Sequence, residues 1–406
     1  MSELQLQIGG LGRRGEGIAA SEGGTLFVPY ALPGETILAD VEGEIARLVR
    51  VISPSPARAQ PSCEYFGRCG GCLLQHFDEA PYRVWKKGLV ETALRHRRID
   101  VRVADLVDAH GRGRRRVSLH VRRQDGKAVA GFMAVRSHVL QPIDHCPILV
   151  PALGRSIEIA CALGEVLGDC DVALTATDSG IDAAVKVERK IADRETPKFG
   201  GLAGSLDLAR LAVNGEVIVT RRTPTVRMGE ASVALPPNPF LQATEDGESR
   251  LAELVVSAAA KAKSVADLFC GCGPFALRLA EHARVSAYDN DKPSIAALSE
   301  AARRTPGLRP VTTAVRDLFR APLVANELKE FDAAVFDPPR AGAEAQARQL
   351  AKSKVKTVVA VSCDPVTLSR DAEILIGGGY ELMTVTPVDQ FKWSPHVESV
   401  AVFRKV

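Results

Sequence analysis

The stretch Asp267-Leu-Phe-Cys-Gly-Cys-Gly-Pro-Phe275 decides the fold of the C-terminal part of this chain. It joins a predicted strand at 264–269 to a predicted helix that ends at His282, and it places two glycines in the turn between them. Glycine lets the backbone approach a bound ligand closely at the carboxyl end of a first strand. The third glycine of a full dinucleotide-binding loop is missing, so this stretch alone is weak evidence for a ligand-binding loop. The neighbouring segments have to support that interpretation.

The segments around this stretch alternate between helix and strand. The patterns lie at 251–262, 284–288, 293–303, 331–336, 356–362 and 365–376, and two final strands follow. This alternation implies right-handed crossovers and a parallel sheet that is covered by helices on both faces. We therefore predict an α/β fold with a Rossmann-like domain over residues 236–406.

Two further domains are expected before it. Residues 1–55 contain short strand patterns separated by glycine-rich turns, which is typical of a small barrel. Residues 56–235 begin with a cysteine-rich stretch and a helical segment at 81–96. Strand patterns with glycine turns follow, with one helical stretch near 152–167, and they indicate a mixed, mostly antiparallel central domain.

Composition and charge narrow the class of protein. With 46% hydrophobic and 25% charged residues, the chain has the composition of an ordinary globular protein. No run of eighteen apolar residues and no secretory leader pattern occur, so we expect no membrane span and a cytoplasmic location. The net charge of +3 indicates no particular partner. The arginine-rich run at 112–123 is either a phosphate contact or a solvated face.

Three acidic residues follow successive predicted strands of the C-terminal domain. Asp289 ends the second strand and suits the two hydroxyls of an adenosine ribose, and Asp317 after the third strand could meet the adenine edge. Asp337 ends the fourth strand in Asp337-Pro-Pro-Arg340, where proline makes a rigid rim. Each aspartate alone is more commonly a helix cap or a turn former. Their order along the sheet favours a cofactor site.

Cys363 and Glu398 form the candidate catalytic pair. Cys363 follows the strand at 356–362 and precedes a helix that begins at Pro365, whose dipole should lower the pKa of the thiol. A thiolate can add to an electron-poor ring, and a carboxylate such as Glu398 can then remove a ring proton. A single cysteine after a strand is more commonly a small core residue. A catalytic role for Cys363 and Glu398 is favoured because the candidate cofactor motifs lie around them in the sequence.

Four cysteines form a separate group. Cys63, Cys69 and Cys72 lie close together in the sequence, and Cys146 is a distant fourth. The odd total of nine cysteines favours reduced thiols, metal ligands or a nucleophile over a disulfide framework. Four thiolates suit zinc and a [4Fe-4S] cluster alike, and the Cys-x-x-Cys pair at 69–72 could instead be a redox pair.

Together, these motifs resemble those of the class I S-adenosylmethionine-dependent RNA (uracil-C5) methyltransferases. The resemblance covers nearly the whole chain, since residues 1–55 resemble the OB-like TRAM barrel of that family. The cysteine spacing within 63–72, with the late Cys146, resembles its [4Fe-4S] motif, which implies iron–sulfur rather than zinc. The segment Pro239-Phe-Leu-Gln242 resembles the family's Phe-x-Gln-x-Asn. The remaining motifs follow in the family's order, at Asp267, Asp289, Asp317, Asp337, Cys363 and Glu398.

The resemblance also implies a role for each residue. Cys363 would be the nucleophile and Glu398 the base. The S-adenosylmethionine would be contacted by Gln242, Phe269, Asp289, Asp317 and Asp337. The sequence departs from the family pattern at Thr244 and Pro274, where asparagine is frequent, and at Asp289, where glutamate is frequent.

The function implied by the resemblance is methylation of carbon 5 of a uridine in structured RNA. A uridine of 23S ribosomal RNA is the first choice and transfer RNA the second, and the barrel and the arginine run would hold phosphates. We expect a monomer without an obligate protein partner. The alternative from another class is a catalytically silent RNA-binding protein, which the presence of both Cys363 and Glu398 disfavours. A cytosine-C5 enzyme is disfavoured because a second cysteine in a Pro-Cys motif is not seen.

Overall fold

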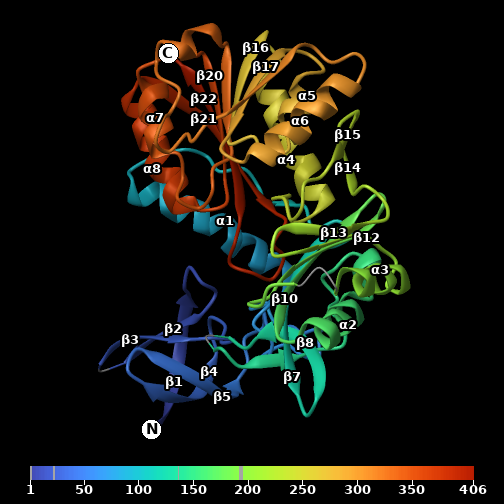
Figure 1. Ribbon diagram of the computed structural model, residues 1–406. Helices are drawn as coiled ribbons and strands as arrows, with labels where there is room; N and C mark the ends of the chain where they lie inside the picture. Colours follow the sequence, from blue (N-terminus) through green and yellow to red (C-terminus); the bar gives the residue numbers. More distant parts are fainter. Residues whose placement is uncertain (1, 22, 136, 192–194) are drawn as a thin grey trace.

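The computed structural model describes residues 2–21, 23–135, 137–191 and 195–406. Its strands form a closed barrel, a seven-stranded sheet and an eight-stranded sheet, together with a two-stranded hairpin, within these ranges. Figure 1 shows the barrel at one end of the molecule, the eight-stranded sheet with its helices at the other, and the seven-stranded sheet beside them.

The N-terminal barrel closes in the order β1-β2-β3-β5-β4. Its strands are β1 (Ser2–Leu11), β2 (Gly17–Ser21), β3 (Gly24–Val28), β4 (Thr36–Glu42) and β5 (Ile45–Ser53). Alternate apolar side chains, among them Leu6, Ile8 and Ile37, point inward and form a small core. The small barrel expected from the sequence is present. Its assignment as a TRAM domain stays a prediction.

The central sheet has the order β13-β12-β11-β10-β7-β8-β9. Its strands are β7 (Arg116–Gln124), β8 (Lys127–Met133), β9 (Leu140–Pro142), β10 (Cys170–Thr177), β11 (Gly180–Lys186), β12 (Leu208–Val213) and β13 (Glu216–Thr220). All neighbours pair antiparallel except β11 and β12. The helices α2 (Ser156–Leu167) and α3 (Thr196–Ser205) share one hydrophobic core with it. The mostly antiparallel pattern agrees with the expectation.

The large sheet has the order β18-β17-β16-β19-β20-β22-β21-β6. Its strands are β6 (Val107–Asp108), β16 (Ser264–Leu268), β17 (Arg284–Asp289), β18 (Val311–Val315), β19 (Ala333–Phe336), β20 (Thr357–Ser362), β21 (Tyr380–Asp389) and β22 (Glu398–Lys405). The five strands from β18 to β20 are parallel, and β22 then runs antiparallel to β20. Strands β16, β19 and β20 are buried along their whole length, as expected for strands that are covered on both faces. Their residues are mainly apolar, with Asp267 of β16 as a buried exception.

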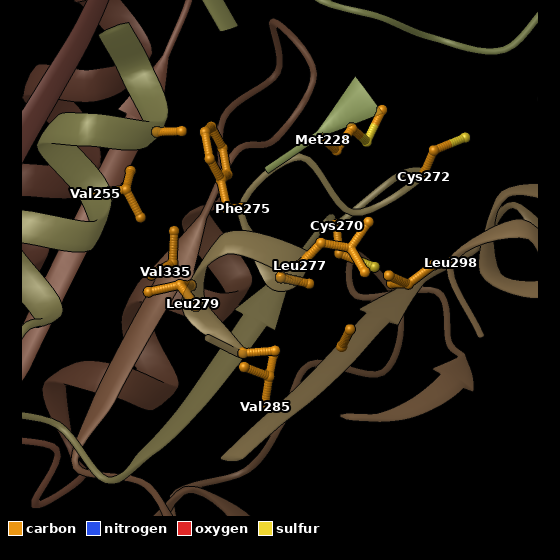
Figure 2. Close-up of a cluster of buried hydrophobic side chains, with 14 of the residues drawn as sticks. Met228, Val255, Cys270, Cys272, Phe275, Leu277, Leu279, Val285, Leu298 and Val335 are labelled. Carbon is orange, nitrogen blue, oxygen red and sulfur yellow. The ribbon is translucent and has the colours of Figure 1, made fainter. Parts of the chain in front are cut away.

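Helices cover both faces of this sheet. One core contains residues of α4 (Glu245–Ala259), α5 (Ala276–Leu279) and α6 (Lys292–Arg304), and Figure 2 shows part of it, including Phe275 and Leu298. The other core contains residues of α1 (Glu79–His96), α7 (Glu344–Ala351) and α8 (Pro365–Gly377). No helix in the described part of the chain has the length and apolar character of a membrane span.

Two parts of the expected central domain, residues 56–235, share hydrophobic cores with the large sheet. Helix α1 and strand β6 come from the presumed central domain, yet Val90, Leu94 and Leu106 pack in the core of the large sheet. The hairpin of β14 (Thr225–Met228) and β15 (Ala231–Ala234) packs in the other core of the large sheet, rather than on the central sheet. Apolar periodicity shows that a segment has a buried face, but it does not show which surface buries that face.

Candidate active site and cysteine cluster

The sheet topology brings the predicted catalytic and cofactor residues to one edge. Parallel strands β16, β17, β19 and β20 end at the same edge of the sheet, so Phe269, Asp289, Asp337 and Cys363 emerge there. Strand β22 is antiparallel to β20 and begins at this edge. Its register pairs Ser362 with Ser399, so Glu398 lies opposite the position of Cys363.

Cys363 is a half-buried thiol beside two carboxyl groups. Burial raises the pKa of the Cys363 thiol to about 12, Glu398 and Asp337 add to the rise, and the Arg340 guanidinium opposes it. In the free chain these effects outweigh the lowering of the pKa that was expected from the dipole of α8. The N-terminus of α8 is in addition capped by Asp364, whose side chain accepts hydrogen bonds from the amides of Val366 and Thr367.

Glu398 is buried, with an exposed fraction of 3%. Its Oε1 accepts a hydrogen bond from Nε2 of Gln390 at 3.2 Å, and its Oε2 has no partner among the described residues. Burial raises the pKa of Glu398 well above its usual range, and the nearby Asp337 adds to this effect. The pKa of Asp337 is also raised by burial, and the hydrogen bond from Gln242 opposes this rise. A carboxyl group with a pKa near neutrality is suited to exchange a proton at physiological pH.

A chain of buried amides connects these carboxyl groups. Nε2 of Gln242 donates to Asp337 at 2.9 Å, and its Oε1 accepts from Nε2 of Gln390 at 2.5 Å. Oε1 of Gln390 accepts from the backbone amides of Ala243 and Thr244, at 2.8 and 3.4 Å. These backbone donors fix which end of the Gln390 amide faces Glu398. The sequence analysis missed Gln390, because nothing in Asp389-Gln-Phe distinguishes it from a surface glutamine.

The glycine loop after β16 has a strained and closely packed backbone. Asp289 accepts a hydrogen bond from the amide of Gly271 at 2.9 Å and so joins the ends of β16 and β17. Phe269 has a φ of 62°, which is unusual for a residue with a side chain. Gly273 has a φ of 91°, and a Cβ there would lie 2.3 Å from a methyl group of Leu298. Strain of this kind is concentrated at functional sites.

Two other predicted residues have local structural roles in the free chain. Asp317 accepts hydrogen bonds from the amides of Phe319 and Arg320, so it shapes its own turn. The ring of Phe319 lies 5.2 Å from that of Phe269, between centroids. Thr244, a departure from the family pattern, is the N-cap of α4 and accepts from the amide of Gly247 at 2.9 Å. This cap explains why α4 begins at Glu245, before the predicted start.

Asp267 is a further buried carboxyl group at this edge. Its exposed fraction is 0%, and neither of its carboxyl oxygens accepts a well-aligned hydrogen bond from a described residue. Burial raises the pKa of Asp267 far above its usual range, the nearby Asp337 and Asp289 reinforce the rise, and the backbone amide of Ala276 opposes it. Unpartnered acceptors at a buried site are costly. The edge at which the parallel strands end therefore carries several carboxyl groups, which are negative when ionised.

The loop between β21 and β22 is held by helix α1. Nζ of Lys86, which is fully buried, donates to Asp389 at 2.7 Å and to the backbone oxygens of Phe391 and His396. The hydroxyl of Tyr82 donates to the other oxygen of Asp389, also at 2.7 Å. Since Glu398 follows this loop directly, α1 contributes to the position of the candidate base.

Cys363 opens into a cavity of about 640 Å³. The walls come from the β1–β2 loop, one face of α1, the start of α8 and the loop before Glu398. The lining residues with ionisable side chains include Arg13, Arg14, His96, Arg340, Asp364 and His396. The barrel and Cys363 therefore border the same space.

The four predicted cluster cysteines also come together. Cys63, Cys69 and Cys72 line one small cavity of about 50 Å³ together with Cys146, which is distant in sequence and is brought to them by the fold. None is in a disulfide. Burial raises the pKa of Cys146 to about 12, and the other three thiols contribute to this rise. Oε1 of Gln75 accepts from the amide of Cys63 at 3.1 Å and orders the loop.

The arginine run at 112–123 is not a single phosphate-binding face. Arg115 is buried and forms a salt bridge of 2.6 Å with Glu248. Arg122 pairs with Asp171, and Arg123 pairs with Glu165. Strand β7 alternates its side chains between the two faces of the sheet, so adjacent arginines point in opposite directions.

Known proteins resemble this chain over its full length. An uncharacterized RNA methyltransferase of Brucella suis biovar 1 is 44% identical over 405 residues, which cover 99% of this chain and 98% of that protein. The 23S rRNA (uracil(1939)-C(5))-methyltransferase RlmD of Halomonas elongata is 33% identical, over 98% of this chain and 88% of that protein. The chain belongs to the family of RNA uracil-C5 methyltransferases.

Two further comparisons concern the C-terminal part and the fold. A family model described as tRNA (Uracil-5-)-methyltransferase matches residues 226–406, which contain both Cys363 and Glu398. The solved structure of the tRNA (uracil-54, C5)-methyltransferase of Pyrococcus abyssi, in complex with S-adenosyl-L-homocysteine, has a TM-score of 0.76. It covers 98% of this chain and 100% of that chain at 21% identity, which shows a shared fold. The expected α/β methyltransferase fold is confirmed.

Proposed function

We propose that this protein transfers a methyl group from S-adenosylmethionine to carbon 5 of a uridine in RNA, with Cys363 as the nucleophile and Glu398 as the base. One observation carries the proposal. The register of β20 and β22 places Glu398 opposite the position of Cys363, at the edge where the glycine loop, Asp289 and Asp337 also lie. Ligands of open α/β sheets bind at this edge.

The reaction divides one difficult step into easier ones. The sulfur of Cys363 forms a bond to carbon 6 of the uracil ring, and the ring becomes an enolate that is nucleophilic at carbon 5. Carbon 5 takes the methyl group, and the sulfonium of the donor becomes a neutral thioether. Glu398 then removes the proton from carbon 5, the bond between sulfur and carbon 6 breaks, and the thiolate is restored.

The residues at the sheet edge fit a cationic cofactor. Glu398 and Asp337 are buried carboxyl groups, and the unpartnered Oε2 of Glu398 and both oxygens of Asp267 remain as acceptors. A sulfonium ion nearby would favour the charged carboxylates. It would also favour the thiolate of Cys363, whose proton passes to solvent in the cavity before the sulfur attacks. We propose Gln242, Phe269, Asp289, Asp317 and Asp337 as the contacts of the cofactor.

The four-cysteine site fits a cluster better than a single ion. In the described part of the chain, no three of these sulfur atoms lie mutually within 4.8 Å. A tetrahedral zinc site with Zn–S bonds of about 2.3 Å would need sulfur atoms roughly 3.8 Å apart. We propose a [4Fe-4S] cluster held by Cys63, Cys69, Cys72 and Cys146. It would link the loop after the barrel to the loop before η1 (Pro151–Leu153) and take no part in methyl transfer.

Ribosomal RNA is the first candidate substrate and transfer RNA the second. The relative from Halomonas elongata acts on uracil 1939 of 23S rRNA and is 33% identical, whereas the transfer RNA enzyme of known structure is 21% identical. Loss of 5-methyluridine from one site of 23S rRNA in a deletion strain would support the first candidate. Loss from transfer RNA would support the second.

Two variants test the chemistry. Cys363→Ala should bind RNA and S-adenosylmethionine yet transfer no methyl group, because the enolate cannot form. Glu398→Gln should transfer the methyl group and then stall as a covalent protein–RNA adduct that survives denaturation and carries the new methyl group. A folding defect would not give these opposite results. Full methylation by Cys363→Ala would refute the assignment of the nucleophile, and a catalytically silent binder would show no methylation in the parent protein.

A further inference from the structure

The cavity at Cys363 is larger than one uracil ring requires. Its volume is about 640 Å³, whereas pockets for whole drug-sized ligands begin at roughly 300 Å³. Cys363 lies at its α8 wall, and the space extends along α1 to the β1–β2 loop of the barrel. There is room for a second nucleotide beside the target uridine.

One face of α1 forms the floor of this extension. The lining residues recur at helical spacing and are Trp85, Gly88, Leu89, Thr92, Ala93 and His96. The adjoining side of the helix packs into the protein through Tyr82, Lys86 and Val90. Small side chains in the middle of the floor leave a hollow, and the indole ring of Trp85 borders it.

Gly88 is the most informative residue of this floor. It lies in the interior of an 18-residue helix, where glycine is unfavourable relative to alanine. A Cβ at Gly88 would meet no atom within 4 Å. Packing within the protein therefore does not require glycine there. What its small size preserves is empty volume inside the cavity.

Positive charge surrounds the hollow. Arg13 and Arg14 are exposed on the β1–β2 loop, and no salt bridge to a described residue occupies either of them. Arg340 lies on the other side, with its guanidinium 3.1 Å from Nε2 of His396. A second cavity of about 410 Å³ also contains Arg14 and His396 in its lining, so the two spaces meet at these residues. The combination of cationic rim and aromatic wall is typical of sites for single-stranded nucleic acid.

We propose that the hollow over Gly88 is a second nucleotide subsite, which holds an unpaired nucleotide adjacent to the target uridine. Its base stacks against Trp85, and the phosphates of the strand lie at Arg13 and Arg14. This inference rests on the proposed function, since that function places the target uridine at Cys363. It assigns to α1 and the barrel loop a part in choosing the RNA.

Short nucleotides test the subsite without any methyl transfer. The probes are uridine monophosphate, the dinucleotide UpA, and an analogue of UpA that lacks the adenine base, titrated into the full chain by calorimetry. The parent protein should bind UpA roughly ten-fold more tightly than either other probe, the fold-change that stacking of about 1.4 kcal/mol gives. UpA should also quench tryptophan fluorescence, and Trp85→Leu should abolish the quenching although Trp393 remains.

Filling the hollow provides the sharpest test. Gly88→Leu should raise the melting temperature, because leucine is the better helix former, yet it should bind UpA no more tightly than uridine monophosphate. Val84→Leu is the matched control, since Val84 is 73% exposed on the same helix and lies outside the cavity lining. It should keep the ten-fold preference. Trp85→Phe should retain part of the preference, and Trp85→Leu should lose it.

The outcomes separate this inference from the proposed function. If the parent protein binds UpA and uridine monophosphate equally, or if Gly88→Leu keeps the preference for UpA, the subsite is refuted while methylation by Cys363 still stands. If Cys363→Ala methylates RNA normally, the proposed chemistry fails whatever the dinucleotide result. If Gly88→Leu does not fold, the comparison of Trp85→Phe with Trp85→Leu decides the matter.

Discussion

Replacing Gln390 by glutamate should separate methyl transfer from release of the product. The change keeps the size of the side chain. It also keeps an oxygen that can accept from the amides of Ala243 and Thr244, at 2.8 and 3.4 Å in the parent. It removes the NH₂ group that donates to Gln242 and to Glu398, and it puts a carboxyl oxygen in its place. The Glu398 carboxylate then loses a hydrogen-bond donor, and a second carboxyl group lies beside it that can also bind the proton.

The magnitude follows from the contact that is lost. A hydrogen bond to a charged group contributes about 1.5–3 kcal/mol, which corresponds to roughly a 10- to 150-fold change. Loss of this donor and repulsion between two carboxylates both raise the pKa of Glu398, which burial and Asp337 already raise. Less of the base is then ionised at neutral pH, so removal of the carbon 5 proton should slow by this factor. The rate should recover as the pH rises.

The assay is a single-turnover reaction followed by denaturing gel electrophoresis. Gln390→Glu should accumulate the methylated covalent adduct at pH 7 and release it at higher pH. Gln346→Glu is the matched control, because Gln346 is a fully buried amide that also accepts from a backbone amide, that of Leu323, away from the site. It should show no adduct. Release by Gln390→Glu at the parent rate across this pH range would refute the role assigned to Gln390.

Three further predictions address the surroundings of the site. Arg340→Gln should move the pH dependence of methyl transfer to higher pH, because Arg340 lowers the pKa of Cys363 and the active form is the thiolate. The shift should be small because Arg340 is exposed. An unchanged pH profile would contradict this role. Lys86→Met should lower the free energy of unfolding by about 3–5 kcal/mol in urea titrations, since it leaves Asp389 buried without its cation, and the double variant with Asp389→Asn should recover part of the loss. Cys69→Ala, purified anaerobically, should contain no bound iron or sulfide. Cys161 is a half-buried cysteine outside the cluster, so Cys161→Ala should keep both. Parent protein that contains zinc alone would contradict the cluster.

The alternation of helices and strands was predictable because each element buries a face with its own period. The order of β16, β17, β19 and β20 and the residues at their ends followed from this pattern. Edge residues such as Asp289 and Cys363 could be grouped from sequence alone, since parallel strands all end at one edge. The pairing of Cys363 with Glu398 then depends on the antiparallel direction of β22 and on its register with β20.

Other features depend on contacts that no local pattern encodes. The sequence shows that α1 has an apolar face, but not that this face joins the core of the large sheet or that Lys86 anchors the loop before Glu398. The arginines of 112–123 show positive charge, but not the acidic partners Glu165, Asp171 and Glu248 that occupy several of them. Which residues a side chain contacts depends on the tertiary fold. For α1 and for these arginines, the local sequence therefore could not identify the contacts.

The state of Cys363 shows how magnitudes decide between two correct effects. The dipole of α8 does favour a thiolate, but such a dipole contributes only about 0.3–1 kcal/mol at ordinary sites. Burial and two neighbouring carboxyl groups act in the opposite direction and raise the pKa to about 12. In the free chain Cys363 is therefore a thiol, and Asp267, Asp337 and Glu398 lie at the same edge with raised pKa values. A cation bound there reverses each of these effects at once, since it favours every ionised form. The sulfonium of the proposed cofactor is such a cation, so binding of the methyl donor would itself prepare the nucleophile and the base. The same site would lose this charge after transfer, when the donor becomes a neutral thioether, and this change favours return of the proton-bearing state once the product has left.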